Sequence, residues 1–179
     1  MSKTMKFIAV LSVIATICFS VLYKYSSMSV FLSLAITFGT TAYHLCIRLI
    51  IGILFNFFMK NRADYTKKWY NVKAWEQKLY TKLKVKKWKN KMPTYDIDAF
   101  NVSKHSWDEI AQASCQSELV HETNIIFSFV PIIFSVWFES IAVFIITSVL
   151  GAAFDLMFVI MQRYNRPRIL KMTSKSAKI

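Results

Sequence analysis

Polar side chains that could act in acid–base chemistry stand at the entrance to an apolar stretch of this chain. They occur as Glu118-Leu-Val-His121-Glu122. At about 100° per residue, Glu118, His121 and Glu122 share one face of a helix, so two carboxylates lie within reach of one imidazole. A carboxylate that accepts a proton from one ring nitrogen fixes the tautomer and makes the other nitrogen a better base. The spacing therefore predicts a catalytic base, His121, oriented by Glu118 or Glu122.

Two other interpretations of this group stay open. Acidic residues also suit a solvated helix start, where they favour the helix dipole. A Glu-x-x-His pair also supplies ligands in carboxylate-bridged iron proteins, but those sites need further ligands from other helices. Only His44 and His105 are left as histidines. We therefore expect no metal.

A second polar group follows another apolar stretch and ends in the letters QRYNRPR, residues 162–168. On a helix Asp155, Gln162 and Arg166 lie along one stripe, and Pro167 disfavours helix at the residue before it. Guanidinium groups bind phosphate through two parallel hydrogen bonds, so this density of donors predicts an anionic ligand. The expected ligand-binding residues are Asp155, Gln162, Arg163, Asn165 and Arg166.

Other cations have separate explanations. Arg168 and Lys171 are expected to be simple orientation charges at the lipid boundary. His44 and Arg48 lie one turn apart inside a long apolar stretch, and we add them to the expected binding site. An arginine at that depth needs a partner, for which Asp155 or the pair Glu118 and Glu122 are candidates.

Composition predicts an all-α, polytopic membrane protein. The chain has 179 residues, is 55% hydrophobic and carries a net charge of +13, which is hard to reconcile with a soluble domain. Three cysteines form no CxxC pair, so no disulfide framework or structural zinc site is implied.

Four apolar stretches are long enough to cross a bilayer. We expect transmembrane helices at about residues 7–25, 29–59, 119–138 and 141–162, within one integral membrane domain of residues 1–179. Pro131 should kink the third, and Glu139 and Ser140 alone separate it from the fourth. The first stretch also suits a secretory signal peptide, but no A-x-A-like site follows it, so an uncleaved anchor is favoured.

Positive charge predicts the orientation. Residues 60–91 hold twelve Lys and Arg, the tail from Arg163 holds six, and Lys3 and Lys6 precede the first stretch. Cytosolic loops retain such residues, so we expect a multi-pass protein of the cell membrane with both termini and residues 60–118 on the cytosolic side.

The central segment is expected to be a basic amphipathic helix lying on an anionic leaflet, from Trp69 to Trp88, ended by residues 92–94. Its apolar side chains recur at steps of three and four: Trp69, Val72, Trp75, Leu79 and Leu83. A basic solvated loop is the alternative. Residues 95–107 look irregular, with turn or cap residues at Asp96, Asp98, Asn101 and Ser103.

Two motifs carry a resemblance to a known family. ELVHE followed by QRYNRPR, together with the basic segment WYNVKAWEQKLY through KKWKNKMP, resembles the glycosyl-4,4'-diaponeurosporenoate acyltransferases, small bacterial membrane proteins of carotenoid biosynthesis. The similarity covers roughly residues 69–168. It implies transfer of a fatty acyl group to a sugar hydroxyl on a lipid-linked glycoside, or to a related glycolipid or lipid.

The resemblance also suggests roles. His121 would be the base on a hydroxyl, Arg163 and Arg166 would hold the phosphates of an acyl-CoA-like donor, and Asn165 or Gln162 would donate to the oxyanion. No cofactor would be tightly bound. The expected partners are a bilayer with anionic lipids and a lipophilic acceptor, with no nucleic acid.

Two other classes remain open from the residues alone. A membrane methyltransferase or reductase would use the same cations for S-adenosylmethionine or NADPH. A non-enzymatic membrane protein would bind anionic lipid and a partner through the basic segment.

Overall fold

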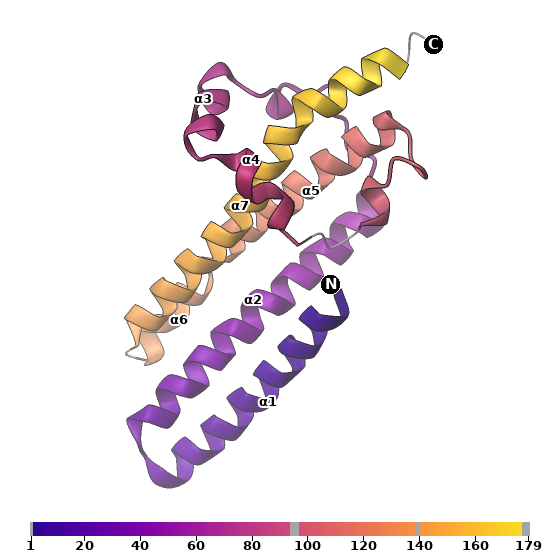
Figure 1. Ribbon diagram of the computed structural model, residues 1–179. Coiled ribbons are helices and arrows are strands. Elements are labelled where there is room, and N and C mark those ends of the chain that lie inside the picture. Colours follow the sequence, from indigo (N-terminus) through magenta and orange to yellow (C-terminus); the bar gives the residue numbers. More distant parts are fainter. Residues whose placement is uncertain (1, 94–96, 139, 177–179) are drawn as a thin grey trace. The chain divides into compact units, whose positions relative to one another are not determined.

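The computed structural model describes residues 2–93, 97–138 and 140–176, and these ranges contain helices and no strand (Figure 1). The α-helices are α1 (Ser2–Ser26), α2 (Ser29–Met59), α3 (Ala74–Lys82), α4 (Val85–Trp88), α5 (Trp107–Phe127), α6 (Pro131–Phe138) and α7 (Ile141–Ser176). Short 3-10 helices cover Lys68–Tyr70, Lys89–Lys91 and Asp98–Phe100. The all-α prediction is confirmed. Thr94 and Asp96, expected at a helix end and a turn, and Glu139 lie outside the described residues.

Four helical segments are long and apolar enough to cross a membrane, as the sequence predicted. They are Lys3–Ser26, Ser29–Met59, Trp107–Phe138 and Ile141–Ser176. The chain divides into two compact units. The first unit comprises Met1–Gly52 and Thr123–Phe154, and the second comprises Ile53–Glu122 and Asp155–Ile179. A single membrane domain stays a prediction.

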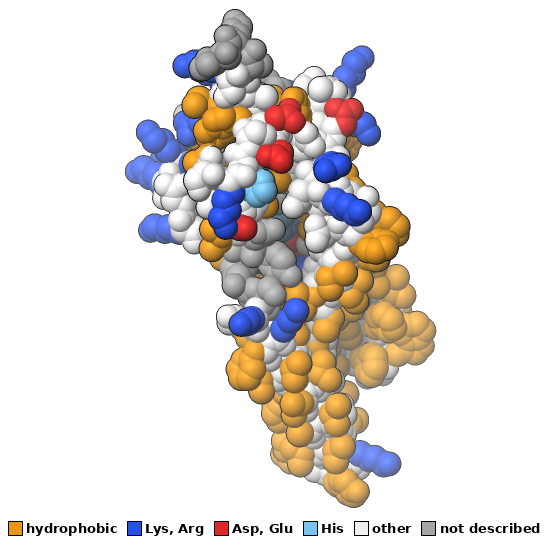
Figure 2. All heavy atoms as spheres, turned by 90° about the vertical axis from the view of Figure 1, so that its right-hand side faces the viewer, with side chains coloured by type: hydrophobic (Ala, Val, Ile, Leu, Met, Phe, Trp, Pro, Cys, Tyr) orange, Lys and Arg blue, Asp and Glu red, His pale blue; other side chains and the backbone are white. Residues whose placement is uncertain are grey.

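In the first unit α1 and α2 pack through small residues. Ser12 and Ala9 of α1 and Thr40 of α2 are buried, and a Cβ at Gly39 would meet the Thr16 Cγ2 atom at 3.5 Å. Small side chains let helix backbones approach closely in lipid, where no hydrophobic force drives association. Figure 2 shows hydrophobic side chains over most of the visible surface of these two helices, which is the surface expected for contact with lipid.

A groove of about 260 Å³ lies within the first unit. Its lining is mostly apolar and comes from α1, α2, α6 and α7, including Thr16, Gly39, Phe134, Phe138 and Phe144. The lining suits hydrocarbon rather than a charged group.

The third spanning segment begins twelve residues earlier than expected. Ser106 and Glu109 form a capping box, in which the Ser106 N–H donates to Glu109 Oε2 (2.8 Å) and the Glu109 N–H donates to Ser106 Oγ (3.3 Å). These two bonds start α5 at Trp107 instead of residue 119. The helix then ends at Phe127, and Pro131 takes the first position of α6, where its missing N–H costs nothing.

The amphipathic helix expected from Trp69 to Trp88 is broken into pieces. Lys84 separates α3 from α4 with a φ of 51°, a left-handed conformation that interrupts a helix. Trp69, Trp75, Leu79 and Leu83 are nevertheless exposed, as the pattern predicted. The expected apolar surface is present, but a single helix does not carry it.

The fourth helix continues to Ser176, well beyond the expected end at about residue 162, and runs through Pro167, which was expected to disfavour helix at Arg166. A proline inside a helix costs about 3 kcal/mol. In the turn before Pro167, Arg163 bonds to Glu118 and Arg166 bonds to the Tyr70 carbonyl. Arg168 bonds back to Tyr164 within α7, so side-chain contacts span the proline.

Candidate functional site

Helices α5 and α7 face each other in the second unit through a row of polar contacts, here called the polar ladder. Residue numbers fall along α5 as they rise along α7, so the two helices run antiparallel. Ser114 and Ser117 pair with Gln162, Glu118 pairs with Arg163, and His121 pairs with Asp155. The ladder brings together most of the residues that the two sequence motifs singled out.

Glu118 is the charged centre of the ladder and is fully buried. Its Oε1 atom accepts a hydrogen bond from Arg163 Nη1 (2.7 Å), and its Oε2 atom is in ion-pair contact with Arg166. Arg166 is only 1% exposed. One buried carboxylate therefore contacts two guanidinium groups, and removing a member of such a buried network leaves an uncompensated charge.

Arg163 has every N–H engaged by the protein. Nε and Nη2 donate to the two oxygens of Glu76 (3.0 and 2.9 Å), and Nη1 donates to Glu118. Nη1 and Nη2 also donate to the backbone carbonyls of Trp69 and Asn71, each at 3.2 Å. These bonds use all five donors of a guanidinium. The geometry therefore contradicts a phosphate-binding role for Arg163, because no N–H is left to donate to one.

Arg166 is held in a similar way. Nη1 donates to the Tyr70 carbonyl (3.3 Å) and Nη2 to the Ser114 carbonyl (3.5 Å), and the guanidinium lies 5.0 Å from the centre of the Tyr70 ring. A side chain this deeply buried cannot reach a soluble donor. Both arginines instead fasten residues 69–76 onto α5 and α7.

Glu76 completes this network and was missed by the sequence analysis. Burial by itself raises the pKa of Glu76, but hydrogen bonds from Arg163 and Tyr80 lower it by more, so the carboxylate is charged at neutral pH. Burial and the bond to Glu76 raise the pKa of Tyr80 to about 12. The sequence did contain one indication that Glu76 is special, because Glu76 and Asp64 are the only acidic residues among the many cations of residues 60–91.

His121 pairs with Asp155, not with either nearby glutamate. Its Nδ1 atom lies 2.8 Å from Asp155 Oδ1, and its ring stacks on Phe158 with centroids 4.4 Å apart. Asp155 is fully buried, whereas the His121 side chain is 19% exposed. The Nε2 atom has no hydrogen-bond partner within the described part of the chain. The buried carboxylate thus orients the ring and leaves one nitrogen open.

Glu118 and Glu122, the orienting residues that the sequence predicted, have other partners. Glu118 binds the arginines, and Glu122 accepts a hydrogen bond from Trp69 Nε1 at 3.0 Å. The prediction failed because helix spacing shows which residues share a face and does not show what the facing helix offers.

Gln162 and Asn165 do not fit an oxyanion role beside His121. Gln162 accepts from Ser114 and donates to Ser117, and Asn165 Oδ1 accepts from Lys89 Nζ (2.7 Å). At a rise of about 1.5 Å per residue, they lie about 10 and 15 Å along α7 from Asp155. A donor to an oxyanion must lie within about 3 Å of it.

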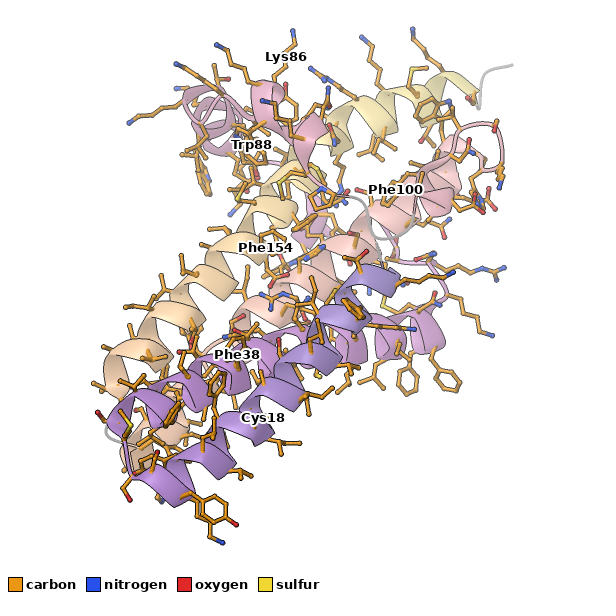
Figure 3. The ribbon with its side chains drawn as sticks, turned by 60° about the horizontal axis from the view of Figure 1, so that its bottom comes forward. Cys18, Phe38, Lys86, Trp88, Phe100 and Phe154 are labelled. Carbon is orange, nitrogen blue, oxygen red and sulfur yellow. The ribbon has the colours of Figure 1, made fainter. Side chains whose placement is uncertain are left out.

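His44 and Arg48 lie in the first unit. Arg48 Nη1 donates to the His44 carbonyl (2.7 Å) and Nη2 donates to the Gly151 carbonyl (2.9 Å), while Phe154, labelled in Figure 3, lies 6.0 Å from the guanidinium carbon. Backbone carbonyls thus supply partners for Arg48. Its pairing with Asp155 or the glutamates stays a prediction, because those residues belong to the second unit.

Comparison with known families decides which functional class the protein belongs to. The family model for glycosyl-4,4'-diaponeurosporenoate acyltransferase matches residues 66–175, which is more than half of the chain. The chain belongs to this family. It is therefore an acyltransferase, and the methyltransferase, reductase and non-enzymatic alternatives are set aside. Searches of curated proteins and of solved structures gave no significant match.

The matched region of this acyltransferase contains every member of the polar ladder and the segment of residues 69–76 that the arginines hold. It also extends beyond the residues on which the resemblance was based. The first two helices lie outside it, which agrees with their lack of distinctive motifs.

The buried ion pairs make a stability prediction. Replacing Glu118 with Gln leaves the buried Arg166 without its counter-charge and removes one of the two carboxylates paired with Arg163, and we expect a loss of about 3–5 kcal/mol. The measurement is unfolding of the purified acyltransferase in detergent. Asp98→Asn is the control, because its carboxylate pairs with Lys104 at the exposed surface, where an ion pair contributes little to stability. Equal stability of the two variants would contradict the account.

Close packing at Gly151 makes a second prediction. A Cβ there would lie 3.1 Å from His44 Nδ1 and Cε1, whereas a Cβ at Gly52 would meet nothing within 4 Å. Gly52→Ala should raise stability by about 0.5–1 kcal/mol through helix propensity. Gly151→Ala should lose about 1–3 kcal/mol by overpacking. Thermal unfolding of the two variants checks this. Equal melting temperatures would contradict the prediction and show that the His44 side chain moves to accommodate the added methyl group.

Proposed function

We propose that this acyltransferase transfers a fatty acyl group to a hydroxyl of a lipid-linked sugar or related lipid, with His121 as the catalytic base. The observation that carries the proposal is the pairing of His121 with the buried Asp155. That carboxylate fixes the proton on Nδ1 and leaves Nε2, on a partly exposed ring, as the proton acceptor.

The reaction can be written as one acyl transfer. Nε2 of His121 takes the proton of the acceptor hydroxyl, and the oxygen attacks the carbonyl carbon of a thioester donor. The tetrahedral intermediate collapses as the carbon–sulfur bond breaks, and the imidazolium returns its proton to the leaving thiolate. The products are an ester and a free thiol. No tightly bound cofactor takes part in these steps.

Asp155 stabilises the imidazolium that forms during this transfer, since a buried carboxylate next to Nδ1 favours the charged ring. Phe158 restricts rotation of the ring by stacking on it. Glu118, Arg163 and Arg166 act as positioning residues, because they fasten α5 to α7 next to the pair formed by His121 and Asp155. Gln162 has the same role through its two serine partners.

The membrane brings the acceptor to the site. Exposed Trp69 and Trp75 among lysines suit the interface of an anionic leaflet, where aromatic rings and positive charge are both favoured. The positive charge of residues 60–91 supports a cytosolic position for this face and both termini, on the side where a soluble acyl donor would be available. The lipophilic acceptor diffuses within the bilayer.

Replacing His121 with Ala should lower the rate of acyl transfer by about two to four orders of magnitude, the usual scale for a positioned base. The measurement is incorporation of a labelled fatty acid into the lipids of membranes that hold equal amounts of each variant. His105→Ala is the control, because His105 sits at the start of α5 beside Glu109 and outside the polar ladder. Unchanged incorporation with His121→Ala would remove His121 from the mechanism.

A further inference from the structure

Two cations converge on one aromatic ring at the cytosol-facing end proposed for α7. Lys89 Nζ lies 5.4 Å from the centre of the Tyr164 ring and donates to Asn165 Oδ1 at 2.7 Å. Arg168 lies 5.1 Å from the same ring centre and donates to the Tyr164 hydroxyl at 3.3 Å. Lys89, Tyr164, Asn165 and Arg168 are here called the cation cluster.

The cation cluster differs from the polar ladder in having no carboxylate. Within the described residues, neither Lys89 nor Arg168 forms an ion pair with an acidic side chain, and their acceptors are a neutral amide and a hydroxyl. Arg163 and Arg166, by contrast, share Glu118. Burial and then the nearby Arg168 lower the pKa of Lys89. An anion between the two cations would relieve this repulsion.

The cation cluster also offers several kinds of hydrogen-bond donor that suit a phosphate group. Arg168 is exposed and has a planar fork of N–H groups, and Lys89 supplies an ammonium. The amide nitrogen of Asn165 has no partner in the described ranges, and its oxygen is occupied by Lys89. Guanidinium, ammonium and amide donors together match the several acceptor oxygens of a phosphate group.

The distance from the catalytic pair indicates which phosphate this is. Asn165 and Arg168 follow Asp155 on α7 by ten and thirteen residues, which corresponds to about 15 and 20 Å along the helix. A phosphate bound there could not belong to the reacting group itself. It suits a donor in which a long extended arm separates the thioester from its phosphates.

We propose that Lys89, Arg168 and the Asn165 amide bind the phosphate of a phosphate-bearing acyl donor. This proposal rests on the acyl transfer proposed above. It moves the donor site away from Arg163, whose N–H groups are all occupied, and from Arg166, which is 1% exposed and paired with Glu118. The site moves to cations that the sequence had suggested were part of the basic segment or simple orientation charge.

The test uses the full chain in nanodiscs of phosphatidylcholine and measures binding of inorganic pyrophosphate by calorimetry. The variant is Lys89→Gln combined with Arg168→Gln. Its control is Lys86→Gln combined with Lys175→Gln, which removes the same charge from exposed side chains; Lys86 points away from the fold in Figure 3. We expect at least tenfold weaker binding for the cluster variant and unchanged binding for the control.

Steady-state rates with a thioester donor give a second readout. The cluster variant should raise the KM for the donor at least tenfold and leave kcat and the KM for the acceptor unchanged. The proposal would be overturned if the cluster variant bound pyrophosphate as tightly as the wild type does. It would also be overturned if the control variant lost as much affinity for pyrophosphate as the cluster variant. Pyrophosphate binding does not require catalysis. If the wild type transfers no acyl group but binds pyrophosphate through the cation cluster, the proposed reaction is refuted and the binding site is not.

A lipid headgroup is the other source of a phosphate. Two results together would show that the cluster binds a lipid headgroup and that the donor assignment is wrong. The cluster variant would differ from the wild type in thermal stability only in nanodiscs that contain phosphatidylglycerol, and pyrophosphate would not bind in nanodiscs of phosphatidylcholine. Saturable pyrophosphate binding in phosphatidylcholine supports it.

Discussion

The buried carboxylate of Glu118 holds two arginines that reach it from α7, and the arrangement of the second unit depends on this contact. A charge removed from water requires compensation, and here each guanidinium also binds backbone carbonyls of residues 69–71. The same network therefore joins α5, α7 and the basic segment. His121 lies one turn beyond Glu118 on α5, so the geometry that satisfies the buried charge also brings its ring next to Asp155.

This arrangement separates structural from chemical roles among residues of similar type. Arg163 and Arg166 are paired with the carboxylates of Glu76 and Glu118 and hold other residues in position. Lys89 and Arg168 instead donate to a neutral amide and a hydroxyl, which is the basis for proposing that they bind an anion. Glu118 pairs with the arginines and Glu122 accepts from Trp69, whereas Asp155 pairs with His121. Partners, rather than residue type, decide the function of each charged group.

Much of this could be predicted from the sequence. Apolar length identified four segments that could span a membrane, and ELVHE with QRYNRPR identified helix faces that contribute to the polar ladder. Helix periodicity could not show that Asp155 lies opposite His121, because the register between two helices depends on packing between residues far apart in sequence. It also missed Glu76, one of two acids in the lysine-rich residues 60–91, and the capping box at Ser106. α7 also continues through Pro167, against the local preference of proline, because contacts of Arg163 and Arg166 with residues far away in sequence stabilise the preceding turn.

The central claim is that this membrane protein adds an acyl group to a lipid, using His121 held by Asp155. Untargeted lipid mass spectrometry of cells expressing the wild type or Asp155→Asn tests it most directly, since no acceptor has to be chosen beforehand. The account predicts a lipid heavier than its precursor by one fatty acyl unit, abundant with the wild type and nearly absent with Asp155→Asn at equal expression. Identical lipidomes, or a mass change of one methyl group or two hydrogens, would contradict it.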